Sequence, residues 1–128
     1  MKHRVWIALW FLLACQWCAA ARTRPRPVRY RCEATAFSMH GKTQLGVHAQ
    51  EGVVAADPRI FPLGTVVRIS DAGPYSGSYV VTDTGSRIIG HRIDIFIASR
   101  LEARRFGRKR VSVHVLRWGD RAANRATP

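Results

Sequence analysis

The sequence predicts a mainly β fold, a small closed barrel of six strands with one short helix. Three observations lead to this prediction. Six short runs rich in β-branched residues are separated by Gly and Pro, which is typical of a compact all-β domain. A single segment carries both the start and the stop signals of a helix. Residues 34–118 contain all of these elements, and closing so small a sheet into a barrel removes its exposed edges.

The six predicted strands follow one another with a Gly or Pro break after most of them. Two of them show clear alternation. Residues 111–115 (VSVHV) predict one buried and one solvated face, and Ile93 and Ile95 share a face opposite to Asp94. The predicted strands are residues 34–37, 53–56, 65–69, 79–82, 93–97 and 111–116.

The predicted helix covers residues 100–106. Ser99 stands directly before it as an N-cap, and Glu102 three residues later completes a capping box. Gly107 follows as the stop signal.

The first 21 residues predict a signal peptide rather than part of the fold. A short basic start is followed by the apolar run 5–13 and by small residues that end at Ala21. A membrane span needs ~20 apolar residues, about twice the length of this run. We therefore expect cleavage near Ala21 and export to the periplasm or cell envelope. The alternative is a lipoprotein anchored at Cys15, because residues 12–15 (LLAC) resemble a lipoprotein box.

The cysteines predict no internal disulfide in the mature chain. Cys15 and Cys18 lie within the signal peptide, which leaves Cys32 alone. Its place in a strand-like run predicts a small, buried, apolar role. If Cys15 is lipidated instead, Cys18 and Cys32 are free to pair.

The charge is strongly one-sided. The chain has 21 Lys and Arg against 8 Asp and Glu, a net charge of +13. Such a chain adheres to polyanions, and for an exported protein these are anionic wall polymers or lipid headgroups. The basic residues gather in flanks, so we expect a basic Pro/Arg linker at 22–33 and a basic tail at 119–128 around a monomeric domain at 34–118. No aromatic RNA-binding signature is present, and nucleic acid is not an expected partner.

Three aspartates stand at unusual places for solvated charges. Asp57 and Asp83 end apolar strands, and Asp94 lies inside one, although Asp is depleted in strands. Structural roles are open for each of them: an Asx-turn for Asp57, a turn cap for Asp83, and for Asp94 a salt bridge or an exposed strand face. An acid among apolar neighbours has a raised pKa, as a general acid needs at neutral pH. The three form a candidate site.

Two stretches sharpen this hypothesis. Residues 52–64 (GVVAADPRIFPLG) and 81–96 (VTDTGSRIIGHRIDIF), with the spacing of Asp83 and Asp94, resemble the 3D domain family, which is named for three aspartates. The family is similar to the catalytic domain of membrane-bound lytic murein transglycosylase A and to stationary-phase survival wall hydrolases. The resemblance implies a double-psi β-barrel.

The resemblance also implies an activity. It points to an exported peptidoglycan lytic transglycosylase that cleaves the β-1,4 bond between N-acetylmuramic acid and N-acetylglucosamine and leaves a 1,6-anhydro product. Asp94 would be the acid and base, supported by Asp83 and Asp57. The implied substrate-binding residues are Thr43, Thr84, Gly85 and Arg92.

The implied reaction needs no cofactor, and the histidines show no metal-ligand spacing, so no metal is expected. The alternative function is a non-catalytic peptidoglycan-binding double-psi barrel module.

Overall fold

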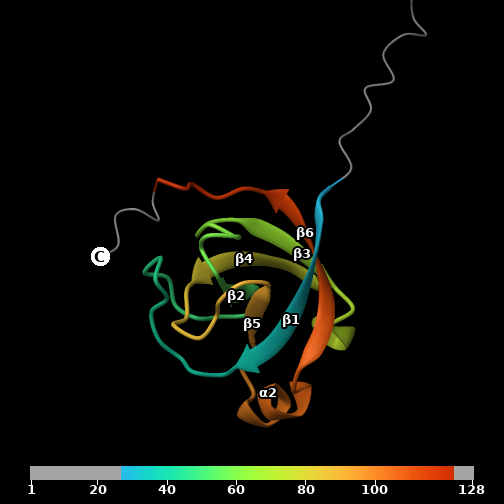
Figure 1. Cartoon of the computed structure of the whole chain (residues 1–128). Coiled ribbons are helices and arrows are strands. Elements are labelled where there is room, and N and C mark those ends of the chain that lie inside the picture. The colour runs from blue at the N-terminus through green and yellow to red at the C-terminus, as the bar shows by residue number, and fades with distance from the viewer. Residues whose placement is uncertain (1–26, 123–128) are drawn as a thin grey trace, which may run out of the picture.

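The computed structural model describes residues 27–122, so the predicted signal peptide and the Cys15 anchor lie outside the described residues. The described chain contains six strands and one α-helix (Figure 1). The elements are β1 (Arg29–Phe37), β2 (Val53–Ala56), β3 (Val66–Ser70), the 3-10 turn η2 (Gly73–Tyr75), β4 (Gly77–Asp83), β5 (Arg92–Phe96), α2 (Arg100–Phe106) and β6 (Lys109–Arg117).

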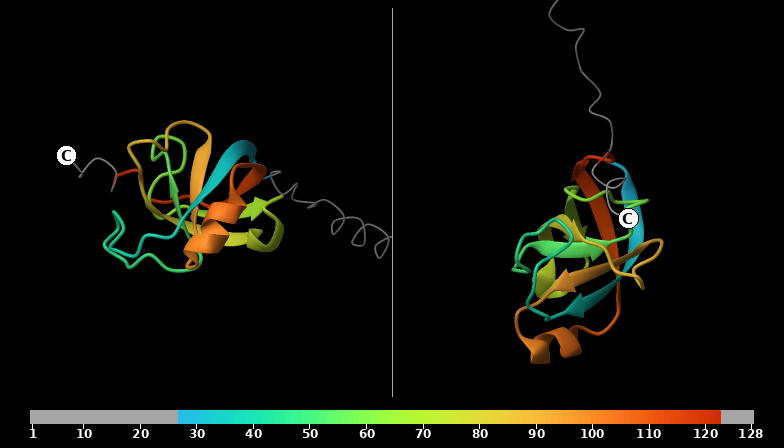
Figure 2. Two further views of the ribbon diagram at one scale, coloured as in Figure 1. Left: turned by 90° about the horizontal axis from the view of Figure 1, so that it is seen from below. Right: turned by 90° about the vertical axis from the view of Figure 1, so that its left-hand side faces the viewer.

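The six strands form a closed barrel in the order β1-β5-β2-β4-β3-β6. The pairs β1/β5 and β2/β4 are parallel, and the other four pairs are antiparallel. The predicted mainly β, double-psi barrel is therefore confirmed. Helix α2 lies below the strands of the barrel in Figure 1 and in the right-hand view of Figure 2.

Strand β1 is longer than the sequence predicts. It begins at Arg29, inside the stretch interpreted as linker, and residues Arg29–Ala34 pair with β6. Cys32 and Ala34 are buried while Arg29 and Arg31 are exposed, which is the alternation of a strand with one buried face.

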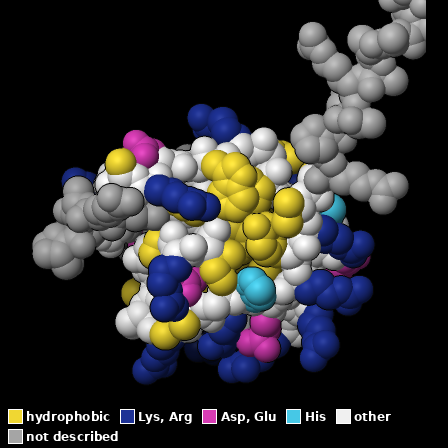
Figure 3. Space-filling model, turned by 45° about the horizontal axis from the view of Figure 1, so that its top comes forward, with side chains coloured by type: hydrophobic (Ala, Val, Ile, Leu, Met, Phe, Trp, Pro, Cys, Tyr) yellow, Lys and Arg dark blue, Asp and Glu magenta, His cyan; other side chains and the backbone are white. Residues whose placement is uncertain are grey.

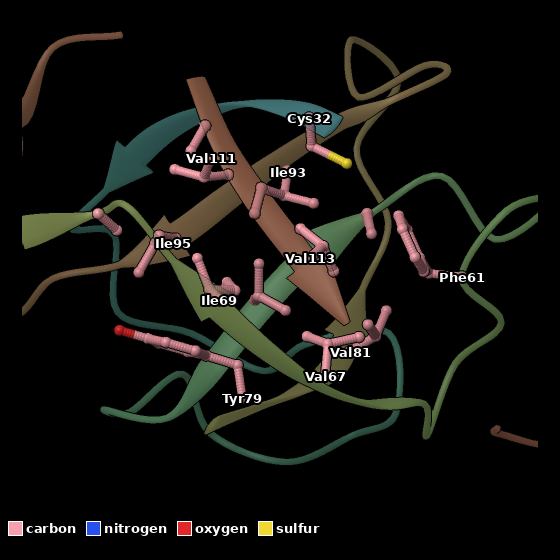
Figure 4. Close-up of a cluster of buried hydrophobic side chains, with 14 of the residues drawn as sticks. Cys32, Phe61, Val67, Ile69, Tyr79, Val81, Ile93, Ile95, Val111 and Val113 are labelled. Atoms are coloured by element: carbon pink, nitrogen blue, oxygen red, sulfur yellow. The ribbon is translucent and has the colours of Figure 1, made fainter. Parts of the chain in front are cut away.

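The barrel interior is a continuous apolar core (Figure 4). It consists of inward-facing side chains from all six strands, because alternate residues of each strand point to the same face. Phe61, from the turn after β2, covers one part of this core and packs edge to face against Tyr30, with ring centroids 5.1 Å apart. The largest fully buried side chains include Phe61, Ile69, Ile93, Ile95, Val54, Val67, Val81 and Val113.

Helix α2 has the predicted bounds and the predicted cap. The Ser99 hydroxyl accepts a hydrogen bond from the Glu102 backbone N–H at 3.3 Å. Gly107 ends the helix with φ of 64°, a conformation that side-chain-bearing residues rarely adopt. Ala103 and Phe106 are its buried residues. None of the helices within residues 27–122 is long and apolar enough to cross a membrane.

Cys32 has the role that the sequence predicts. Only 3% of the residue is exposed, and it is a free thiol within the described part of the chain. Burial raises the pKa of Cys32 to about 11, so the unreactive thiol form prevails at neutral pH. Cys18, the alternative partner, lies outside the described residues.

The core predicts a clear stability difference between two isoleucines. Ile95 is fully buried, whereas Ile89 is 59% exposed. Ile95→Ala should lower the free energy of unfolding by about 3–4 kcal/mol, because it leaves a cavity in the barrel. Ile89→Ala is the matched control and should change that free energy by no more than about 0.5 kcal/mol. Urea denaturation followed by circular dichroism measures both. Equal effects of the two substitutions would contradict the barrel packing.

Candidate functional site

A groove of about 290 Å³ opens on the outer face of strands β2, β4 and β5. Its walls come from these strands, from the end of β1 and from the loops at residues 38–49 and 84–90. Asp83 and Asp94 both line it. The other lining residues are Phe37, Met39, His40, Gly41, Lys42, Thr43, Ala49, Ala55, Thr84, Gly85 and Ile88.

Ala55 occupies the middle of the groove floor. On one side it pairs with Asp94 of β5, and on the other it pairs with Asp83 of β4. Because adjacent strands lie ~4.8 Å apart, the backbones of the two aspartates are about 10 Å apart across β2. The methyl group of Ala55 is too small to fill this space, so the two carboxyl groups face one concavity.

A β-bulge brings Asp83 to this face. Val54 pairs with Val81, but the next residue, Ala55, pairs with Asp83, which leaves Thr82 as the extra residue. Val81 points into the core, and in a regular strand Asp83 would point inward as well. The Thr82 hydroxyl is buried without a hydrogen-bond partner among the described residues. An unpaired buried hydroxyl is destabilising. The bulge that turns Asp83 toward the groove therefore lowers the stability of the fold.

Asp94 lies on β5 between two core isoleucines, with its own side chain partly buried on the groove face. The Thr35 hydroxyl of the neighbouring strand β1 donates to Asp94 Oδ1 at 3.0 Å. Burial raises the pKa of Asp94, and the Thr35 hydrogen bond and the positive charge of Arg92 partly oppose this rise. Asp83 is not among the groups that shift this pKa.

Asp83 is oriented by two backbone N–H groups. Thr84 donates to its Oδ1 at 2.8 Å and Gln44 at 3.2 Å. The second bond ties the loop at residues 38–49 to the end of β4, and Leu45 N–H adds a bond of 3.0 Å to the Thr82 carbonyl.

Thr43 lies in this same loop and lines the groove, as the resemblance implies for a substrate-binding residue. It is 6% exposed. Its hydroxyl donates to the Val47 carbonyl at 3.0 Å, and the Val47 carbonyl also accepts from Thr43 N–H at 2.8 Å. Thr43 therefore holds the turn of the loop and presents little of its surface.

Asp57 does not line the groove, unlike Asp83 and Asp94. The side chain is buried, and Arg59 donates to it from the backbone N–H, Nε and Nη2 at 2.7–3.0 Å. Gly90 N–H donates to Oδ2 at 2.8 Å. These bonds hold the pKa of Asp57 far below its usual range. Asp57 thus joins the Asx-turn after β2 to the loop at 84–90.

Of the other residues that the resemblance implies for substrate binding, some line the groove and one does not. Thr84 and Gly85 line the groove, whereas Arg92 does not. Arg92 forms an ion pair of 3.3 Å with Glu33, its register partner on β1, so its guanidinium is engaged beside the groove. Gly85 packs closely, since a Cβ there would lie 2.6 Å from Ile88 Cγ1.

Sequence reasoning missed Thr35, Ala55 and Gln44. Thr35 and Gln44 donate hydrogen bonds to aspartates, and Ala55 is a strand neighbour of one. These aspartates are distant in the chain, and only the fold brings them close. The alternation of β1 places Thr35 on the outer face, but nothing in the sequence indicates its partner. Within residues 27–122 no three His, Cys, Asp or Glu side chains come together as a metal site.

The chain is similar in sequence to one known domain family and to several curated proteins. The 3D domain family profile matches residues 52–117, more than half of the chain. In Bacillus subtilis, YabE, named for cell wall shaping, is 34% identical over 65% of this chain and 20% of its own length. The cell wall-binding protein YocH is 35% identical over 65% of this chain and 31% of its own length. The chain thus matches a fifth to a third of these curated relatives.

Solved structures support the fold. The lytic transglycosylase MltA of Escherichia coli, in its crystal structure with bound chitohexaose, is 22% identical with a TM-score of 0.50. The likeness covers 62% of this chain and 28% of the MltA chain. At this identity the likeness shows a shared fold.

The bonds of Asp57 predict a large and pH-dependent loss of stability on substitution. Asp57→Asn keeps the shape but removes the charge that accepts from Arg59 and Gly90, and should lower the free energy of unfolding by about 2–3 kcal/mol at neutral pH. Because the folded state lowers this pKa, ionised Asp57 stabilises the fold above about pH 4, and this contribution fades as the pH falls. The difference between the two proteins should therefore shrink in acid.

Urea denaturation at pH 7 and at pH 3 measures this difference. Asp120 is an exposed aspartate near the C-terminus. The variant Asp120→Asn is therefore the matched control and should behave like the unchanged protein. A difference that stays constant with pH would show that the ionised carboxylate is not what stabilises the turn.

Proposed function

The chain belongs to the 3D domain family, and from this premise we propose that it is a lytic transglycosylase acting on the glycan strands of peptidoglycan. One observation carries the proposal. Asp94, a partly buried carboxyl group with a raised pKa, lies in a groove opposite Asp83. The names of YabE and YocH, which refer to the cell wall, and the lytic transglycosylase with the same fold support the choice of polymer.

The environment of Asp94 fits the needs of an acid catalyst. A general acid must hold its proton near the working pH and release it to the substrate. Burial favours the protonated form, and Asp94 forms no ion pair within residues 27–122 that would hold it ionised. The Thr35 hydroxyl bonds to one carboxyl oxygen, Oδ1, and this leaves Oδ2 for the substrate.

The proposed reaction uses Asp94 twice. The protonated carboxyl donates its proton to the glycosidic oxygen as the bond from that oxygen to C1 of N-acetylmuramic acid breaks. Positive charge develops on the sugar ring. The Asp94 carboxylate then takes the proton of the C6 hydroxyl, whose oxygen bonds to C1 and closes a 1,6-anhydro ring. The proton returns to Asp94 and no water is consumed, so a second catalytic carboxylate of the usual glycosidase kind is not needed.

The other groove residues position the substrate. Asp83 accepts from Thr84 and Gln44 through Oδ1, which leaves Oδ2 to accept hydrogen bonds from sugar hydroxyls. The aromatic side chains of Phe37 and His40 form a wall against which a sugar ring can pack. Asp57 acts from outside the groove as a positioning residue, because its bond to Gly90 holds the loop that carries Thr84 and Gly85. On this proposal the protein works outside the cytoplasmic membrane, in line with the export expected from residues 1–21.

The second candidate function is peptidoglycan binding without cleavage. Two observations favour it. YocH is named for binding to the cell wall, and the groove of about 290 Å³ is at the lower limit of the size usual for ligand sites. Digestion of purified sacculi distinguishes the two. Anhydro-muropeptides indicate a lytic transglycosylase, reducing-end products indicate a hydrolase, and retention without release indicates a binding module.

Substitution of Asp94 tests the catalytic assignment. Asp94→Asn preserves the size of the side chain and removes the proton donor, so release of anhydro-muropeptides should fall by about 10²-fold or more. The free energy of unfolding should change little, because burial already disfavours the ionised form of Asp94 and Asn keeps the shape of the side chain. Asp120→Asn is the control for a lost aspartate charge and should cleave normally. Near-normal release by Asp94→Asn would overturn the assignment.

The pH dependence tests the protonation state. Because the pKa of Asp94 is raised, cleavage should be fastest in mildly acidic buffer and should decline as the pH rises through that pKa. Thr35→Val removes a hydrogen bond that lowers the pKa, so the decline should move to higher pH. Asp83→Asn should leave the pKa unchanged. Carboxyl titration by NMR and pH–rate profiles measure these shifts, and an Asp94 pKa below the free value of ~3.9 would exclude the general-acid role.

A further inference from the structure

A second hollow, of about 590 Å³, lies beside the groove. The two share an aromatic partition: Phe96 lines the second hollow and packs edge to face against Phe37 and His40 of the groove, with ring centroids 5.5 and 5.6 Å apart. The second hollow is lined by Glu51, Gly52, Pro74, Tyr75, Gly77, Ser78, Tyr79, Phe96, Ile97, Ala98, Ser99 and Glu102. We call it the acidic hollow.

The charge of the acidic hollow is opposite to that of the molecule. Its lining contains two of the 8 acidic residues, Glu51 and Glu102, and none of the 21 Lys and Arg. The face of the molecule in Figure 3 shows the usual situation, with many Lys and Arg side chains and few Asp and Glu. Neither glutamate forms an ion pair within residues 27–122. A concave surface lined by uncompensated carboxylates attracts cations.

Aromatic side chains complete the acidic hollow. Tyr79 is 8% exposed, and its hydroxyl donates to the Tyr75 carbonyl at 2.6 Å. The Tyr75 hydroxyl donates to Glu102 Oε2 at 3.0 Å and so fixes that carboxylate at the rim. Glu51 lines the same hollow. Burial raises the pKa of both tyrosines, and the negative charge of Glu51 adds to the rise. Aromatic rings with adjacent carboxylates are the usual surroundings of a bound ammonium or guanidinium group.

We propose that the acidic hollow binds the free ammonium group of a peptide attached to the glycan strand. This inference rests on the proposed function, which places the glycan in the groove on the other side of Phe96. A peptide substituent of that strand can pass over the partition formed by Phe37 and Phe96 and present a side-chain ammonium to Glu51 and Glu102. The groove would then bind the sugars and the acidic hollow would bind the peptide of the same polymer.

Chemical acetylation of the polymer tests the proposal. Purified sacculi are compared before and after N-acetylation of their amino groups, with the protein carrying Asp94→Asn to prevent cleavage. At about 0.15 M salt, retention should fall about three- to tenfold on acetylated sacculi. General charge attraction predicts the opposite, because acetylation makes the sacculi more negative and the chain is strongly basic. Unchanged or increased retention would overturn the proposal.

Variants locate the effect. Glu51→Gln combined with Glu102→Gln keeps the shape of the hollow and should bind untreated sacculi as weakly as the parent protein binds acetylated ones. Asp120→Asn is the control for lost negative charge and should retain the full response to acetylation. A double variant that still distinguishes the two kinds of sacculi would also contradict the proposal.

A third polymer separates this inference from the proposed function. Glycan strands stripped of their peptides should bind the parent protein and the double variant equally. If neither binds these strands, the glycan site is refuted. If both bind them and the acetylation effect is absent, the glycan site stands and the ammonium site is refuted.

Discussion

The pairing of the short strand β2 is the constraint on which the barrel and the groove both depend. All four of its residues are buried, and it is parallel to β4 and antiparallel to β5. Val54 and Ala56 complete the core, while Ala55 faces outward between two aspartates. Because Val54 and Ala55 pair with strands on both sides, β2 cannot shift without exposing apolar surface on one face and separating Asp83 from Asp94 on the other.

Different forces hold the two carboxyl groups of the groove. Asp94 lies in a regular strand where burial, opposed by one neutral hydrogen bond, favours its protonated form. Asp83 owes its direction to a bulge and receives two backbone N–H groups. Asp57, with the same side chain, is bound by a guanidinium and by backbone N–H groups, and is kept ionised. Burial and local hydrogen bonding therefore give three residues of the same type three different environments.

Charge is distributed differently over the general surface and in the two hollows. Most of the surface is basic, which suits long-range attraction to a polyanionic polymer. The concave regions differ from it: the groove combines two carboxyls with apolar walls, and the acidic hollow has no basic lining residue. Exposed charges are screened within ~8 Å at physiological salt, so on the proposed function the basic surface would attract the polymer and the two hollows would provide the specific contacts.

The sequence by itself determined the fold class, the helix with both of its caps and the outward direction of Asp94, because strand alternation and capping depend on near neighbours. Residues 52–64 and 81–96 also identified the family. Only the tertiary structure decided which side chains meet. Asp94 and Thr35 are 59 positions apart, and the bulge at Thr82 turns Asp83 toward the groove. Asp57 ends an apolar strand, as Asp83 does, and the sequence therefore made it a candidate site residue. In the structure its carboxylate is bound by Arg59 and Gly90 and does not line the groove. Strand register and side-chain partners of this kind depend on packing across the barrel, which local sequence patterns do not encode.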